Sequence, residues 1–148
     1  MSILILFACI GFLIAILWTD LVFDSSVLPY RGKNELLPEE VLSTTSHYYR
    51  RVTYKPYALF VIMAAMLTVI IQQIIQSLVP AWVGWISLLL FLVPTGYASV
   101  YIIPVAGRLG SRTDTIEKQS EIARSLFNAH VFCLILIVLL AAVQFYAA

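Results

Sequence analysis

Four long apolar runs alternate with two polar segments along the chain. The runs cover residues 3–23, 57–79, 82–106 and 125–146. Each is long enough to cross a bilayer, which takes about 20 helical residues. Backbone polar groups must be paired within hydrocarbon, so each run should be a helix. The pattern predicts an all-α membrane protein, an antiparallel four-transmembrane-helix bundle formed by a single domain over residues 1–148.

A further helix is expected between the first two spans. The stretch "PEEVLSTTSHYYRRVTYK" begins with a proline and two acids, which suit the first turn of a helix. We expect it to lie in the membrane interface, with Tyr48, Tyr49, Tyr54 and Tyr57 in the headgroup zone. Pro56 should kink or restart the chain where the second span begins.

The charged residues are confined to two loops and their edges, and we place the loops at residues 24–56 and 107–124. The loops hold all nine bases, namely Arg31, Lys33, Arg50, Arg51, Lys55, Arg108, Arg112, Lys118 and Arg124. By the positive-inside rule, both loops face the cytoplasm and both termini lie outside. The expected location is therefore integral to a membrane, and we expect the cytoplasmic membrane of a bacterium.

Composition supports a lipid-facing surface. Hydrophobic residues make up 61% of the chain and charged residues 11%, against about 25% charged in soluble domains. The net charge of +1 argues against a nucleic-acid partner, which would require a basic stripe. The expected partners are the lipid bilayer, other membrane-protein subunits or further copies of this chain, and a hydrophobic aromatic ligand.

Two polar stripes occupy the loop-side halves of the third and fourth spans. Residues at spacings of 3 and 4 share one helix face, and two such rows should pack together across the short second loop. Two interpretations are open: a hydrogen-bonded seam around kinked helices, or a pocket that binds a ligand. The candidate residues of either are Tyr97, Tyr101, Arg108, Glu121, Arg124, Asn128 and His130.

A second candidate group lies at the end of the first span. Asp20 and Asp24 are one helical turn apart, and we expect them to form interfacial ion pairs with Arg50 and Arg51. Acids near a histidine could also indicate a metal site. However, the chain has no spacing that would set two metal ligands on one helix, so we predict no metal and identify no cofactor.

Three places in the chain resemble the anthrone-oxygenase-like family of small four-span membrane proteins. These are "VLP" after the first span, "RRVTYKPYALF" at the second, and "YIIPVAGRLG" followed by "SLFNAHV". The asparagines that flank the third-span proline in that family are Ile103 and Ala106 here. The resemblance implies a four-helix membrane fold, and family members that act as oxygenases oxidise polycyclic anthrones.

Three functions remain open from the sequence. Since nucleophilic triads and phosphate-binding loops are absent, we favour a non-catalytic accessory or structural subunit of a membrane complex. The alternative is an inner-leaflet binding protein or oxygenase-like enzyme for an amphipathic aromatic, quinone-type ligand, with His130 or His47 as acid or base. A glutathione-type transferase shares the topology, but its basic, Asn and Glu pattern is missing from "VTYKPYALFVIM".

Overall fold

The computed structural model describes residues 2–30, 36–54 and 57–147. The predictions for Arg31, Lys33, Lys55 and Pro56 lie outside these residues. The elements are α1 (Ser2–Asp24), the short 3₁₀ helix η1 (Ser25–Tyr30), α2 (Glu39–Val52), α3 (Tyr57–Ile75), α4 (Ala81–Tyr97), the π-helix η2 (Ala98–Ile102), α5 (Ile103–Ser111) and α6 (Ile116–Ala147).

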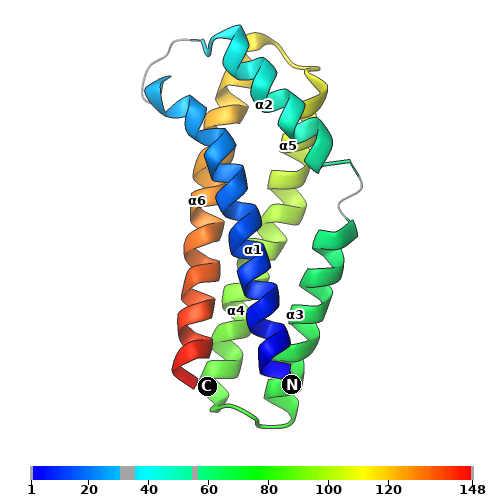
Figure 1. Ribbon diagram of the computed structural model, residues 1–148, viewed down its shortest axis with the longest axis vertical. Helices are drawn as coiled ribbons and strands as arrows, with labels where there is room; N and C mark the ends of the chain where they lie inside the picture. Colours follow the sequence, from blue (N-terminus) through cyan, green and yellow to red (C-terminus); the bar gives the residue numbers. More distant parts are fainter. Residues whose placement is uncertain (1, 31–35, 55–56, 148) are drawn as a thin grey trace.

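The predicted four-helix membrane bundle is confirmed. Four helical stretches are long and apolar enough to cross a membrane: Ile3–Tyr30, Tyr57–Ile75, Ala81–Ser111 and Ile116–Ala147. They run antiparallel side by side, and both chain termini lie at the same end of the bundle (Figure 1). We call this the terminal end, and the opposite end, which carries α2, the loop end.

The third span is one helical stretch whose hydrogen-bond pattern changes along its length. Pro94 and Pro104 each lack a backbone N–H, so neither can donate to the helix ladder. The π-turn η2 lies between these two prolines and joins α4 to α5 without an interruption. Single π-turns accommodate irregular hydrogen bonding inside helices and often occur at functional sites.

Helix α2 crosses the loop end and packs closely on α5 (Figure 1). The close approach depends on Gly110, where a Cβ atom would lie 2.8 Å from the backbone nitrogen of Arg50. Arg112 adds an ion pair to Glu39, with Nη2 donating to Oε2 at 2.8 Å. The helix was predicted to hold its tyrosines in the headgroup zone, but Tyr49 is 2% exposed, because the inner face of α2 is packed on the bundle.

The core divides into two apolar clusters. One lies at the loop end and joins α2, α5 and α6, with Tyr49, Leu109 and Leu126 among its members. The other holds α1, α3, α4 and α6 together toward the terminal end. Beside the second cluster, Gln144 exchanges hydrogen bonds with Gln73 at 3.0 Å and donates to Ser87 Oγ at 2.8 Å. Each buried amide therefore has a partner within the bundle.

Candidate functional site

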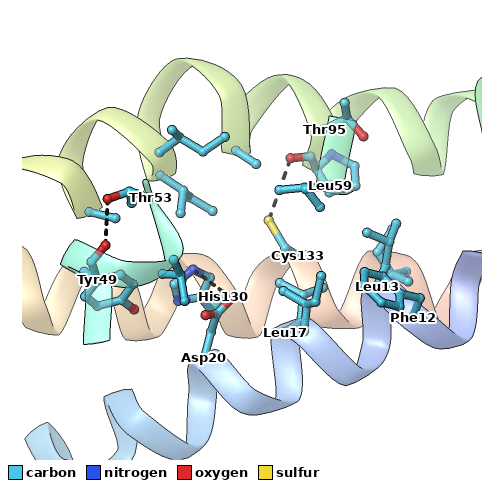
Figure 2. A pocket seen from close by; sticks show the side chains of 18 of the residues that line it. Phe12, Leu13, Leu17, Asp20, Tyr49, Thr53, Leu59, Thr95, His130 and Cys133 are labelled. Carbon is cyan, nitrogen blue, oxygen red and sulfur yellow. Dashed lines mark hydrogen bonds and ion pairs between the residues drawn. The ribbon is translucent and has the colours of Figure 1, made fainter. Parts of the chain in front are cut away.

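A cavity of about 320 Å³ lies inside the bundle, toward the loop end. Its wall is contributed by α1, α2, α3, α4, η2, α5 and α6, and most of it is aliphatic. Figure 2 shows Phe12 and Leu13 at one end of this cavity, and Asp20, Tyr49 and His130 at the other. Cavities of this kind, mainly apolar with a few convergent polar groups, are typical of small-molecule sites.

Five side chains form a polar cluster at the loop-end side of the cavity: Asp20, Asp24, Tyr48, Tyr49 and His130. The Tyr49 hydroxyl donates to Asp24 Oδ1 at 2.6 Å, and the other oxygen of Asp24 lies 2.7 Å from His130 Nδ1. The Tyr48 hydroxyl donates to Asp20 Oδ1 at 2.5 Å. His130 thus lies between two carboxylates that tyrosines hold in place.

The members of the cluster differ in their access to the cavity. Asp20, Tyr48, Tyr49 and His130 line it, whereas Asp24 is fully buried behind His130. Asp24 therefore orients the imidazole, in the way that a carboxylate fixes the ring and tautomer of a neighbouring histidine. This leaves His130 Nε2 facing Asp20 Oδ2 at 3.8 Å.

Burial keeps the two tyrosines of the cluster protonated. It raises the pKa of Tyr49 far above its ordinary value, and the negative charge of nearby Asp24 raises that pKa further. The pKa of Tyr48 is raised in the same way by burial and by its hydrogen bond to Asp20. Both hydroxyls therefore remain hydrogen-bond donors to the carboxylates throughout the physiological pH range.

Cys133 follows His130 by one helical turn and also lines the cavity. Its Sγ lies 3.9 Å from the carbonyl oxygen of Pro94 (Figure 2). Cys133 is 3% exposed and packs as a small apolar residue whose thiol donates a weak hydrogen bond to α4.

The polar stripes predicted on the third and fourth spans meet in part. Tyr101 hydroxyl and Ser125 Oγ lie 2.5 Å apart, and the Tyr97 ring stacks on Tyr101. Tyr97 and Asn128 line a separate, shallow hollow with Phe132. These contacts join α4, η2 and α6, and they lie outside the cavity.

The charged members of those stripes have other neighbours. Arg108 makes two hydrogen bonds to Asp114 in the turn before α6. Glu121 accepts a hydrogen bond from Lys118 on the exposed face of α6. Arg124 is half-buried and does not line the cavity. Of the seven residues proposed for the seam or pocket, only His130 lines the cavity.

The acids at the end of α1 have partners that differ from those expected. Ion pairs with Arg50 and Arg51 were predicted, but Asp20 and Asp24 bond to tyrosines and to His130. Arg50 points to α5 instead, and its Nε donates to the carbonyl oxygen of Gly110 at 3.2 Å. The reason is the orientation of α2, which turns its tyrosines inward and its two arginines outward.

A metal site is not evident in the described part of the chain, where no group of three or more His, Cys, Asp or Glu side chains is arranged to hold an ion. The arrangement is instead suited to hydrogen bonding and proton exchange. Sequence reasoning missed Tyr48 and Tyr49 as site residues. Their one available signal was the Asp20–Asp24 pair, which needs buried donors if it lies inside the bundle.

Comparisons of the chain with protein-family models, with curated proteins and with solved structures found no match.

Proposed function

We propose that the protein binds a small amphipathic aromatic molecule from the membrane, in the cavity between its spans. The observation that carries this proposal is the cavity itself, about 320 Å³ of mainly aliphatic wall that ends at Asp20 and His130. Such a site accepts a flat apolar body along α1, α4 and α6 and holds its polar end at the cluster. Its volume falls in the range of about 300–1,000 Å³ that ligand pockets occupy.

Access to the cavity from lipid is consistent with its lining. Phe12 and Val52 belong to the wall, yet their side chains are 44% and 42% exposed on the outside of the bundle. The wall of the cavity therefore includes side chains that also lie on the outer surface of the bundle. If the charged loops face the cytoplasm, as the positive-inside rule predicts, a ligand would enter from the inner leaflet.

The resemblance to the anthrone-oxygenase-like family agrees with this class of ligand, because anthrones are polycyclic aromatics. His130 is the residue that would exchange a proton with a bound ligand, since Asp24 orients it toward the cavity. Binding is the part of the proposal that the geometry supports, and an oxygenase step would be additional to it.

The accessory-subunit hypothesis stays a prediction. Large apolar side chains cover the outside of all four spans, but this is expected of any lipid-facing helix and does not single out a protein partner. The cavity, in contrast, is a feature that a purely structural subunit does not require. We therefore place ligand binding first.

The test combines native mass spectrometry with a variant that fills the cavity. Ala98 lines the cavity, whereas Ala64 is exposed on the outer face of α3, so Ala98→Phe and Ala64→Phe form a matched pair. After gentle extraction, the natural chain and Ala64→Phe should carry a small aromatic adduct, and Ala98→Phe should not. The proposal would be rejected in favour of the accessory role by a heteromeric assembly in which the two variants carry equal adducts. A heteromeric assembly in which none of the three proteins carries an adduct would reject it as well.

A further inference from the structure

In the described residues, and with a neutral histidine, the polar end of the cavity offers hydrogen-bond acceptors to a ligand and no free donor. Both tyrosine hydroxyls are already used, since Tyr48 donates to Asp20 and Tyr49 donates to Asp24. His130 Nδ1 carries the proton that it shares with the Asp24 carboxylate, because an ionised carboxylate can only accept. In the neutral imidazole the remaining nitrogen, Nε2, is therefore an acceptor.

The two acceptor atoms that remain are close together and unbridged. Asp20 Oδ2 and His130 Nε2 lie 3.8 Å apart, beyond hydrogen-bond distance. Both residues line the cavity, and Asp20 is 8% exposed. A donor group on a ligand could reach both atoms at once, whereas a carbonyl oxygen would face two acceptors and be repelled.

The charged groups around the cavity also favour a ligand that donates hydrogen bonds. The groups that act on Asp20 come from three elements: Asp24 on α1, Tyr48 on α2 and His130 on α6. The wall from α3, α4, η2 and α5 is uncharged in the described residues. The cluster holds two carboxyl groups and one imidazole, and no Lys or Arg side chain lines the cavity in the described residues. Burial makes an uncompensated charge costly.

We propose that the ligand is a lipophilic cation, an aromatic body that carries a protonated amine, and that its ammonium group binds between Asp20 and His130. This inference rests on the proposed function and specifies its ligand class. The ammonium would donate to Asp20 Oδ2 and His130 Nε2 and would offset the charge of the Asp20 carboxylate. Both atoms must be unprotonated to accept from the ammonium, so a proton that either holds in the empty site leaves on binding.

Three naphthyl probes separate the ligand chemistries: naphthylmethylamine, which is a cationic donor, naphthylmethanol, which is a neutral donor, and naphthoquinone, which only accepts. Binding is measured by calorimetry on the full chain in phosphatidylcholine nanodiscs. Only the part that Ala98→Phe removes and Ala64→Phe retains counts as cavity binding. The amine should bind about tenfold or more tightly than the alcohol, and the quinone should bind most weakly.

The amine's affinity should also rise with pH, by up to about tenfold per pH unit while one proton is displaced, and the alcohol's should not. Asp20→Asn keeps an acceptor for Tyr48 but removes the charge, so the preference for the amine should fall to near one. Glu40→Gln removes an exposed charge on α2 and should leave the preference unchanged. If Asp20→Asn does not fold, the pH dependence of the natural chain decides the question.

The two proposals fail in different ways. If no probe shows binding that Ala98→Phe removes, the proposed function itself is wrong. If the alcohol or the quinone binds in the cavity at least as tightly as the amine, and independently of pH, the site takes a neutral aromatic ligand and the cationic class is wrong. An amine preference that survives Asp20→Asn would also overturn it.

Discussion

At the scale of single residues, the cluster shows how hydrogen-bond donors allow two carboxyl groups to be buried. Asp20 and Asp24 would be costly inside a membrane bundle if they had no donors. Two adjacent tyrosines of α2 supply them, one hydroxyl to each carboxylate. The imidazole of His130 then forms a hydrogen bond with the second oxygen of Asp24. Each side chain of the cluster is hydrogen-bonded to another member, so the loss of one side chain should weaken the hydrogen bonding of the others.

Tyr49→Phe tests this mutual dependence. The change removes only the hydroxyl that donates to Asp24, at a side chain 2% exposed. We expect the free energy of unfolding to fall by about 1–3 kcal/mol, because a buried charged acceptor loses a partner. Denaturant unfolding in detergent measures it. Tyr146→Phe, at a side chain 79% exposed, is the control, and equal stability of the two variants would contradict the prediction.

The same variant has a second signature at high pH. The pKa of Tyr49 in the folded protein is raised by burial and by Asp24, whereas the unfolded chain titrates near pH 10. The folded state therefore keeps a proton that the unfolded state releases. Stability is complete below about pH 10 and falls as the pH rises further. The loss of stability above pH 10 should be smaller in Tyr49→Phe. An equal fall in melting temperature above pH 10 in the variant and the natural chain would contradict this prediction.

At the scale of elements, the site depends on how α2 is held across the loop end. Its tyrosines reach the cluster because its backbone lies against α5 at Gly110. The third span brings Pro94 and Ala98 to the wall of the cavity, with the π-turn η2 between the two prolines. A small residue and an irregular helix therefore position the site without contributing a functional group.

Two glycines of α5 give a matched test of this contact. In Gly110→Ala the new Cβ would lie 2.8 Å from the nitrogen and 3.1 Å from the Cα of Arg50, both backbone atoms that cannot rotate away. We expect a loss of about 1–3 kcal/mol in stability. Gly107→Ala meets nothing within 4 Å and should be neutral or gain up to about 1 kcal/mol. Thermal unfolding of the pair measures the difference, and similar melting points would show that α2 does not pack here.

At the scale of the whole molecule, the orientation in the membrane would set which leaflet supplies the proposed ligand. Both termini lie at one end and α2 at the other (Figure 1). The bases in the part of the chain that the structure describes lie toward the α2 end, Arg50, Arg112 and Lys118 among them. We therefore expect both termini outside and the loop end in the cytoplasm.

Reporter fusions at the C-terminus test this orientation in bacterial cells. Alkaline phosphatase fused after Ala148 should be active and green fluorescent protein dark, because the first folds outside the cytoplasm and the second inside it. Fusions after Ser111, in the turn before α6, should give the opposite pattern. Reversed results would place the cavity near the outer leaflet, and they would leave its ligand chemistry unaffected.

The sequence by itself determined the fold class and the membrane spans. Hydrocarbon accepts only long apolar segments whose backbone bonds are internal, so composition and run length are sufficient for that conclusion. It also placed helices at α2 and at the start of α6, and it identified His130, Asp20 and Asp24 as unusual polar residues near the ends of spans. These are local properties that need no knowledge of packing.

Only the tertiary structure decided which of those polar residues meet. Helical spacing shows that Glu121 and Asn128 share a face, but not whether that face points to a cavity, to solvent or to lipid. The rotation of α2 about its own axis turned Tyr48 and Tyr49 inward and Arg50 outward, and the packing of the third span against α6 placed Pro94 and His130 in the wall of one cavity. The rotation and packing of helices result from contacts between residues far apart in sequence, which no local pattern contains.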